Sequence, residues 1–190
     1  MDNWILGQGF AILEKRMNSE PPKPPTVVIF MGVAGSGKTT VAALFAKKTG
    51  AAFYEGDQYH SPENIAKMRS GVPLTDTDRE PWLVTLRNLI IGSLAAGKSM
   101  VLACSALKAK YRDELAAGDS RVKFVHLTGP KALIAERLKN RPGHFMPAGL
   151  LTSQLDTLEP PKDALVLSCE KTPLELVAEA AHALGIALSD

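Results

Sequence analysis

One segment constrains this chain more than any other, because it stands between a buried strand and a helix. The residues Gly32-Val33-Ala34-Gly35-Ser36-Gly37-Lys38-Thr39 match the pattern G-x-x-x-x-G-K-[ST] in full. The apolar, β-branched run before it, 26–31, is typical of a strand that is buried on both faces. A helical pattern begins at about Lys38. This context is the one that the motif requires, so the segment predicts a phosphate-binding loop in a parallel α/β fold.

The residue types of this loop suit a nucleotide. The glycines let backbone N–H groups point inward at phosphate, and the helix N-terminus adds a partial positive charge. We expect contacts from all of 32–39 and from Thr40. Lys38 is predicted to reach the β- and γ-phosphates as a catalytic residue, and Thr39 to give a hydroxyl ligand to Mg²⁺. The alternative is a Gly-rich turn without a ligand, and the flanking strand and helix argue against it.

Apolar runs alternate with helix-period segments along the rest of the chain. Strands are predicted at 26–31, 51–55, 100–103, 122–127 and 164–168. Helices are predicted at 38–48, 62–70, 79–96, 106–117, 130–139, 150–158 and 173–184. This alternation predicts one five-stranded parallel sheet with helices on both faces, a three-layer α/β/α fold. Ligands of such sheets bind beyond the carboxyl ends of the strands, where the motifs of this chain lie.

Bulk composition excludes several other classes of protein. The 190 residues fit one compact domain, and a net charge of +2 is too small to favour nucleic acid or an anionic membrane as a partner. No apolar stretch reaches the roughly 18 residues of a transmembrane helix. Cys104 and Cys169 form no Cys-x-x-Cys pair, which argues against a disulfide framework or a thiolate zinc site. A reducing, cytoplasmic location is therefore expected.

The first 25 residues form a segment of their own. Apolar residues between Trp4 and Leu13 come before the basic pair Lys15-Arg16, whereas a secretory signal has its basic residues first. Residues 21–25 are rich in proline, which favours a stiff, extended spacer. We therefore divide the chain into an N-terminal extension with a Pro-rich linker, 1–25, and one domain, 26–190. A membrane tether is the weak alternative for the extension.

Phosphoryl transfer needs a group that orients the attacking hydroxyl, and often a carboxylate that accepts its proton. Asp57 follows the second predicted strand, so we expect it beside the loop, as a candidate base and as a metal ligand through water. A turn or cap aspartate explains its position equally well. His60 is a candidate donor to substrate hydroxyls, although a lone histidine is more often structural.

Charged residues surround the turn residues of the segment 67–83. One interpretation is an acceptor pocket in which Arg69 and Arg79 hold a carboxylate. The other is a solvated loop that ends in a helix capped by Asp78. Trp82 is expected in the core.

Polar residues also follow the third predicted strand. Ser105 and Lys108 stand at its carboxyl end and are candidates to contact a substrate. The alternative is that Ser105 simply caps a helix and that Lys108 is simply exposed. The run Tyr111-Arg112-Asp113 is consistent with a surface patch.

The segment 137–158 is a candidate mobile lid. Arg137 and Arg141 are four residues apart and share one helix face if the last turn holds. Arginines there can stack on adenine or neutralise the transferring phosphoryl group. The alternative is favourable basic charge at a helix C-terminus.

Taken together, these motifs resemble those of the small gluconokinases, which belong to the adenylate-kinase-like group of P-loop kinases. The resemblance spans roughly 27–160. Its matching blocks are Met31 through Thr39, Gly56-Asp57 through His60 with Asn64, Lys67-Met68, Pro73-Leu74-x-Asp76-x-Asp78-Arg79-x-Pro81-Trp82-Leu83, Cys104 through Lys108, Tyr111-Arg112-Asp113, Gly143-His144-Phe145, Ser153-Gln154 and Leu158-Glu159. Many nucleotide enzymes share the first block, and the joint occurrence of the others is far more specific.

The resemblance implies a P-loop kinase fold with a mobile lid, and transfer of phosphate from ATP to D-gluconate with Mg²⁺. It also implies a homodimer. It supports Lys38, Asp57 and Arg137 as catalytic residues and Arg137 and Arg141 on the nucleotide side. The expected substrate-binding residues are Asp57, His60, Arg69, Arg79, Ser105, Lys108, His144 and Gln154.

Two other kinds of function are compatible with the same phosphate-binding loop. A kinase for another small hydroxy acid or for a nucleoside monophosphate uses the same loop. A non-catalytic nucleotide switch also uses it, although the chain has no Asn-Lys-x-Asp motif that would read guanine.

Overall fold

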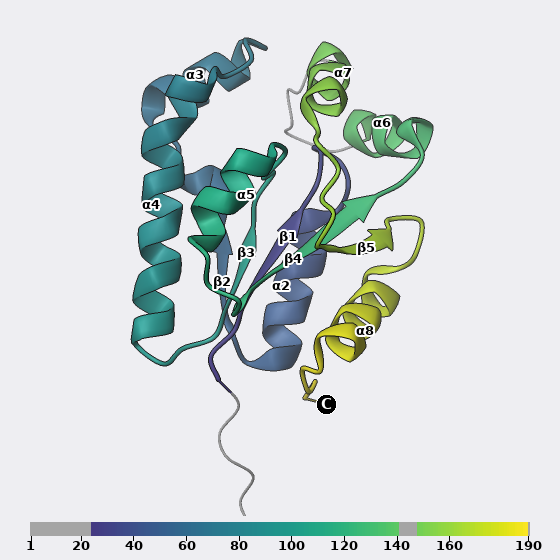
Figure 1. The fold of residues 1–190 in the computed structure, drawn as a ribbon. Coiled ribbons are helices and arrows are strands. Elements are labelled where there is room, and N and C mark those ends of the chain that lie inside the picture. Colours follow the sequence, from purple (N-terminus) through teal and green to yellow (C-terminus); the bar gives the residue numbers. More distant parts are fainter. Residues whose placement is uncertain (1–23, 141–147, 190) are drawn as a thin grey trace, which may run out of the picture.

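A five-stranded parallel sheet forms the centre of the protein, in the order β2-β3-β1-β4-β5 (Figure 1). The computed structural model describes residues 24–140 and 148–189. The strands are β1 (Val27–Met31), β2 (Ala52–Glu55), β3 (Met100–Ala103), β4 (Val122–Thr128) and β5 (Leu165–Ser168). The predicted parallel sheet and its number of strands are confirmed.

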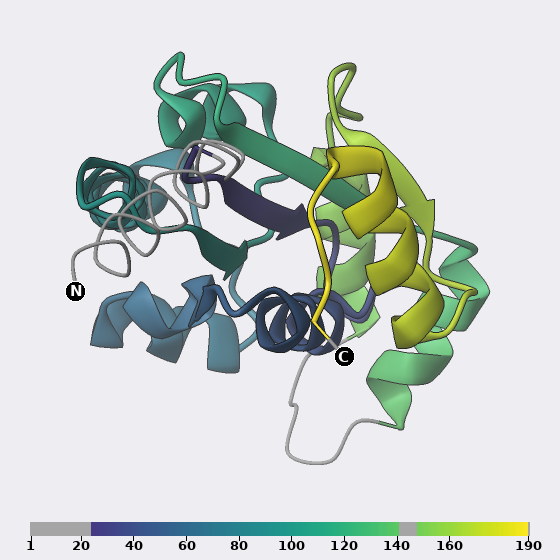
Figure 2. The ribbon, with the colours of Figure 1, turned by 90° about the horizontal axis from the view of Figure 1, so that it is seen from below.

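Helices cover both faces of the sheet, so the predicted three layers are confirmed. The helices are α2 (Lys38–Thr49), the 3-10 helix η1 (Gly56–Tyr59), α3 (Pro62–Arg69), α4 (Asp76–Ala95), α5 (Ala109–Ala116), α6 (Lys131–Lys139), α7 (Ala148–Thr157) and α8 (Pro173–Leu184). Helices α4 and α5 pack on one face, and α2 and α8 on the other (Figure 2).

The central strand β1 divides its side chains between two apolar cores. All five of its residues are buried. Val27, Ile29 and Met31 belong to the core under α4 and α5. Val28 and Phe30 belong to the core under α2 and α8. Successive side chains of a strand point to opposite faces, which explains why this run is apolar throughout.

Helix α4 begins three residues before its predicted start, and Asp78 does not cap it. The N-cap is Thr75, whose hydroxyl accepts a hydrogen bond from the backbone N–H of Asp78 at 3.1 Å. The Asp78 carboxylate in turn accepts from the N–H of Thr75 at 2.8 Å. This reciprocal pair is a capping box, in which the aspartate is the third helical residue and not the cap.

Removing the Thr75 hydroxyl is expected to destabilise the fold modestly. Thr75→Ala should lower the free energy of unfolding by about 1 kcal/mol, because one backbone donor of the first turn loses its acceptor. Urea denaturation measures this change. Thr77→Ala is the matched control, since Thr77 is also exposed in the same turn but does not cap the helix. Equal losses in the two variants would contradict the assignment of the cap.

Helix α5 starts three residues later than predicted, and its first turn is more buried than a surface patch. Ala106 has φ +42°, so the chain turns between β3 and the helix. Lys108 is the N-cap residue. Tyr111 and Arg112 are only 3% and 9% exposed. The Arg112 guanidinium donates to the carbonyls of Ala106 and Leu107, which fixes this turn.

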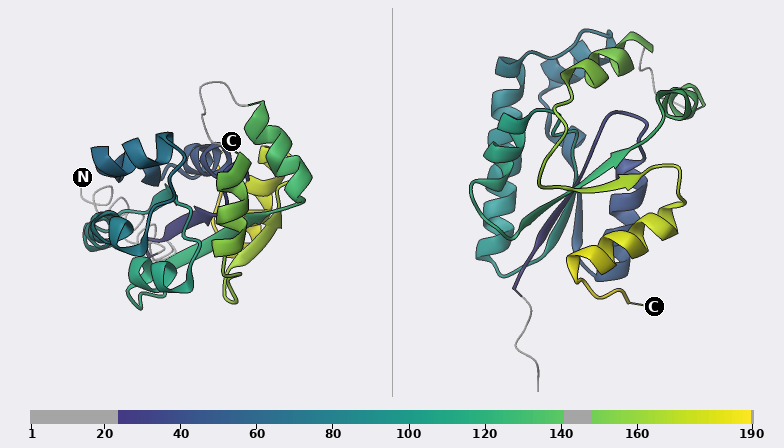
Figure 3. Two further views of the ribbon diagram at one scale, coloured as in Figure 1. Left: turned by 90° about the horizontal axis from the view of Figure 1, so that it is seen from above. Right: turned by 45° about the vertical axis from the view of Figure 1, so that its right-hand side comes forward.

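The segments that follow the strands gather at one end of the molecule. Helices α3, α6 and α7 lie at the carboxyl ends of the strands, above the sheet in Figure 1 and seen from above in Figure 3. Of the helices in the described ranges, none combines the length and apolar character needed to cross a membrane. Because ligands of parallel α/β sheets bind beyond the carboxyl ends of the strands, a site is expected at this edge.

Candidate active site

The loop after β1 has the close packing that its glycines require. Gly32 has φ +138°, and a Cβ there would lie 2.5 Å from the carbonyl oxygen of Leu127 on β4. Gly37 precedes α2 in the left-handed region, at φ +95°. Ser36 is fully buried, and its hydroxyl has no hydrogen-bond partner among the described residues. The start of the loop thus packs so closely against β4 that only glycine fits at position 32.

Helix α6 packs directly on this loop. A Cβ on Gly35 would lie 2.7 Å from the Leu138 side chain and 3.0 Å from the carbonyl oxygen of Ile134. Arg137 lies between these two residues in the last turn of α6, and its side chain is exposed. The fold therefore brings the helix that carries Arg137 to the loop. Arg141 and His144 lie outside the described residues.

Lys38 and Thr39 connect the loop to the end of β2. The Lys38 ammonium donates to the carbonyl of Val33 at 3.0 Å, so it lies over the loop. The Thr39 side chain hydrogen-bonds Glu55. Burial raises the pKa of Glu55 above its ordinary value; the charge of Asp57 also raises it, while Thr39 and Lys38 lower it. The carboxylates of Glu55 and Asp57, the Thr39 hydroxyl and the Lys38 ammonium thus lie together where the loop meets the end of β2. We call this group of four side chains the corner.

The donors of this corner fit Mg²⁺. Magnesium prefers oxygen ligands and usually keeps several waters, so it needs few protein groups. Thr39 supplies a hydroxyl oxygen, and Glu55 and Asp57 supply carboxylates. The described residues contain no group of three or more His, Cys, Asp or Glu that could hold a metal alone. The corner therefore suits a cation that is held partly by a nucleotide and by water.

Asp57 projects from a turn that is itself firmly packed. It lies in η1, and its side chain is exposed. The preceding residue, Gly56, is buried, and its carbonyl accepts a hydrogen bond from the Trp82 indole N–H at 2.8 Å. The His60 ring stacks on Trp82, with centroids 4.4 Å apart. Trp82 is therefore a core residue, as expected, and it also holds the turn that presents Asp57.

His60 is packed more tightly than a surface donor would be. It is 8% exposed, and its Nδ1 atom has no hydrogen-bond partner among the described residues. Burial lowers its pKa; Asp57 opposes this effect and Arg79 adds to it. The site therefore contains a histidine that favours the neutral form.

The burial of His60 predicts a pH dependence of stability. In the unfolded chain His60 takes up a proton as pH falls through about 6.5, while the folded state resists this. The free energy of unfolding should therefore fall between pH 7.5 and pH 5.5. His60→Phe keeps a ring on Trp82 and should reduce this loss. Chemical denaturation at the two pH values measures it. Buried His126, whose pKa is also lowered by burial, should leave part of the loss in place, and an unchanged loss would refute the assignment to His60.

A pocket of about 230 Å³ opens beside the loop. Its walls come from the end of α3, the α3–α4 connection, the start of α4, the segment after β3, and α7. The lining residues are Met68, Val72, Pro73, Leu74, Thr75, Asp76, Arg79, Leu107, Lys108, Ser153, Gln154 and Thr157. Three predicted substrate-binding residues, Arg79, Lys108 and Gln154, thus meet in one place.

Gln154 joins the pocket to the phosphate-binding loop. Its side-chain oxygen accepts a hydrogen bond from the backbone N–H of Ala34 at 2.7 Å. The same residue lines the pocket. A molecule in the pocket therefore lies close to the phosphate cradle, with Gln154 between them.

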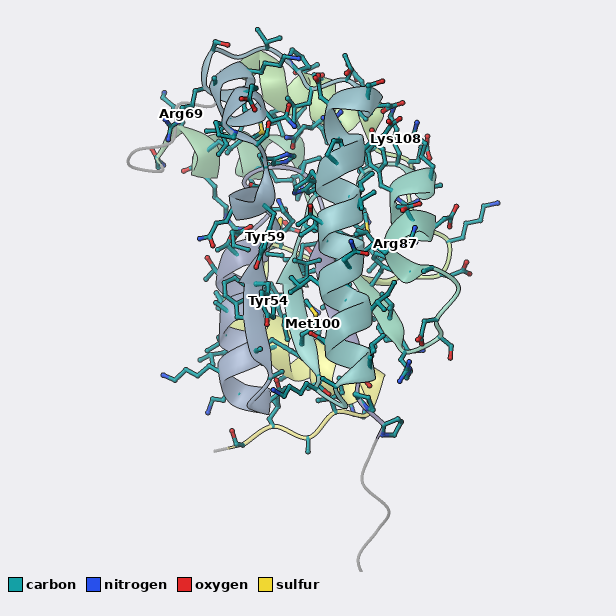
Figure 4. The ribbon with its side chains drawn as sticks, turned by 90° about the vertical axis from the view of Figure 1, so that its left-hand side faces the viewer. Tyr54, Tyr59, Arg69, Arg87, Met100 and Lys108 are labelled. Atoms are coloured by element: carbon teal, nitrogen blue, oxygen red, sulfur yellow. The ribbon has the colours of Figure 1, made fainter. Side chains whose placement is uncertain are left out.

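Two other predicted residues are placed differently. Arg69 ends α3 with its side chain exposed and is not among the residues that line the pocket. Figure 4 shows Arg69 and Lys108 on opposite sides of the α3–α4 end of the molecule. Ser105 is partly buried, and its carbonyl accepts from the N–H of Gly32 at 3.3 Å, which ties the end of β3 to the loop. Of the two proposed carboxylate clamps, only Arg79 lies on the pocket wall.

Residue-by-residue reasoning did not identify Asp76, which lines the pocket and binds Lys108. It matched the family pattern, but its partners come from the start of α5. No local sequence signal identifies such a contact, because it depends on how two helices pack.

A phosphate-binding loop at the start of α2, next to a separate cationic pocket at the same sheet edge, defines a P-loop kinase. The family model described as an AAA domain matches residues 27–161. The "Probable gluconokinase" of Rattus norvegicus is 47% identical over 181 residues, covering 84% of this chain and 98% of that protein. The chain belongs to the gluconokinase family.

Two solved structures agree with this assignment. The crystal structure of a sugar kinase from Janibacter sp. HTCC2649 is 49% identical, with a TM-score of 0.81, and the match covers 86% of this chain and 96% of that one. The crystal structure of a gluconokinase from Sinorhizobium meliloti 1021 is 43% identical, with a TM-score of 0.76, and covers 85% and 92%. The predicted family and fold are confirmed.

Proposed function

We propose that this chain transfers the γ-phosphoryl group of ATP to D-gluconate, giving ADP and 6-phospho-D-gluconate. Membership of the gluconokinase family is the observation that carries this proposal. The pocket agrees with it, since its charged lining residues are two cations, Arg79 and Lys108, and one carboxylate, Asp76. One net positive charge suits an acceptor that carries a single carboxylate.

The positions of the side chains suggest how gluconate binds. Arg79 and Lys108 bind its carboxylate at the far wall of the pocket. Gln154, which reaches the Ala34 N–H, lies on the side of the loop. The terminal hydroxyl of gluconate then points toward the loop and Asp57. His60, Arg69, Ser105 and His144 remain predicted contacts with the sugar acid.

The reaction follows from this arrangement. The terminal oxygen of gluconate bonds to the γ-phosphorus as the bond to the bridging oxygen of ADP breaks, and Asp57 accepts the hydroxyl proton. Lys38 and Arg137 stabilise the negative charge on the transferring group, and Arg141 acts on the nucleotide side. Thr39, Glu55 and Asp57 would hold Mg²⁺, in part through water, and the ion would neutralise phosphate charge. Positioning and charge stabilisation supply most of the rate.

Three further properties belong to the same proposal. Segment 137–158 acts as a lid that excludes water, which otherwise competes with the sugar hydroxyl. Within it, residues 141–147 lie outside the described part of the chain. The enzyme works in the cytoplasm, where its two buried, unpaired cysteines stay reduced. It works as a homodimer, as the family resemblance predicts.

Acceptor-dependent ADP release tests the proposed function. Purified protein with Mg-ATP is assayed with gluconate, with other sugar acids, with nucleoside monophosphates and with no acceptor. Release that gluconate stimulates most strongly supports the proposal. Stimulation by another acceptor would assign a different kinase, and nucleotide binding without stimulated release would favour a switch.

A further inference from the structure

A cluster of charged groups joins the start of α4 to the start of α5 at the pocket wall. Asp76, the first residue of α4, stands at its centre. Its carboxylate accepts hydrogen bonds from the Lys108 ammonium at 2.7 and 3.0 Å and from the Lys110 ammonium at 2.7 Å. It also accepts one from the Tyr111 hydroxyl. One carboxylate therefore organises three donors from the same turn of α5.

The aromatic ring of Tyr111 completes the cluster. It is buried, and three cationic groups lie near its ring centroid: Arg79 at 5.8 Å, Lys108 at 5.8 Å and Lys110 at 5.7 Å. Hydrogen bonds from Lys108, Lys110 and Tyr111 hold the pKa of Asp76 far below its ordinary value. Burial and Asp76 raise the pKa of Tyr111 to about 12. At neutral pH the cluster therefore keeps its carboxylate ionised and its phenol protonated.

Only part of this cluster faces the pocket. Asp76, Arg79 and Lys108 line it, whereas Lys110 and Tyr111 are not among the lining residues. Lys108 precedes the first residue of α5, and its ammonium sits on a flexible four-carbon stem. Such a stem samples many rotamers unless a partner restrains it. The two bonds to Asp76 provide that restraint on the pocket side.

We propose that Asp76 is a positioning residue, which holds the Lys108 ammonium at the pocket wall where it meets the carboxylate of the acceptor. This inference rests on the proposed function, because it assumes a carboxylate-bearing acceptor in the pocket. Asp76 itself does not contact the acceptor's carboxylate, since the two like charges repel. Lys110 and Tyr111, which do not line the pocket, donate hydrogen bonds to the Asp76 carboxylate and fix its orientation.

Steady-state kinetics of Asp76→Asn, Lys108→Met and the double variant test this inference. Asp76→Asn should raise KM for gluconate about 10-fold, the loss expected for hydrogen bonds between charged groups, with kcat changed by less than about 3-fold. The same change in the Lys108→Met background should alter KM by less than about 2-fold, because the residue acts through Lys108. Asp76→Glu keeps the carboxylate and should restore part of the affinity.

Controls separate positioning from a merely structural role. KM for ATP should stay unchanged in Asp76→Asn. Asp113→Asn removes another carboxylate of α5, which is exposed, and should leave KM for gluconate unchanged.

Each contrary result overturns the inference in a recognisable way. Additive effects of Asp76→Asn and Lys108→Met would show that Asp76 acts without Lys108. An equal rise in KM for ATP would show general damage to the site, and an unchanged KM for gluconate would show that no positioning is needed. Wild-type protein without gluconate-dependent ADP release would refute the proposed function itself, and this inference with it.

Discussion

Lys38→Met is expected to lower kcat by about 100-fold or more, the scale of losing a group that stabilises transition-state charge. The ammonium lies over the phosphate-binding loop, 3.0 Å from the carbonyl oxygen of Val33. Methionine keeps a long, unbranched side chain but has no charge. The loss should therefore appear in the transfer of the γ-phosphoryl group and not in the folding of the loop. Single-turnover measurements with saturating Mg-ATP and gluconate quantify it.

Lys47→Met provides the matched control for this variant. Lys47 is exposed in the last turn of the same helix, α2, at the opposite end from the loop. This control should retain wild-type turnover. If Lys38→Met also retained it, the loop would not act on a triphosphate as proposed, and the nucleotide switch would become the better interpretation.

Asp57→Asn is expected to lower kcat by about 100-fold or more, since about 100-fold is the lower end of the contribution of a general base. The substitution keeps the size of the side chain and removes the proton acceptor. The turn that carries it should persist, because Gly56 and Trp82 hold it through a backbone carbonyl and an indole N–H. KM for ATP should change little. A coupled ADP-release assay at saturating gluconate measures the loss.

Glu63→Gln is the control for Asp57→Asn, since Glu63 is an exposed carboxylate in the helix that follows the turn. Its turnover should equal that of the wild type. An Asp57→Asn enzyme with unchanged turnover would contradict the base assignment. Glu55, whose pKa is raised by burial, would then be the next carboxylate to test at the same corner.

Together these variants divide the site into two halves. Lys38 belongs to the phosphate cradle, which the loop after β1 and the start of α2 form. In the proposed function Asp57 acts on the acceptor side, and it lies on the turn after β2. Gln154 contacts the first half and lines the pocket of the second. A kinase needs both halves at a fixed separation. The parallel sheet provides it, because β1 and β2, although separated by β3, end at the same edge of the sheet.

Helix ends and helix faces were predicted less well than the elements themselves. Asp78 was expected to cap α4, but Thr75 caps it. The two residues form a reciprocal capping box, and both residue types are common N-caps. In α8, the apolar side chain of Leu174 is 64% exposed, whereas those of Leu176 and Val177 are buried. Leu174 lies in the first turn, and the packing of α8 against the sheet selects the buried face.

The polar residues of the pocket that Arg79 and Lys108 line were only partly predictable. Arg69 and Arg79 have the same side chain and lie in the same charged segment, but only Arg79 lines the pocket. Tyr111 and Arg112 resembled a surface patch and are buried. The local sequence does not show whether a polar side chain will be buried, exposed or line the pocket, because this depends on how neighbouring elements pack.

The sequence by itself determined the phosphate-binding loop, the alternation of strands and helices, and the parallel sheet. These depend on glycine positions and on apolar periodicity within short segments, which act locally. Only the tertiary structure decided which polar side chains meet. Asp76 binds Lys108 across 32 residues, and Gln154 binds the Ala34 N–H across 120. Such contacts arise when distant elements pack at one sheet edge, and no local pattern encodes that geometry.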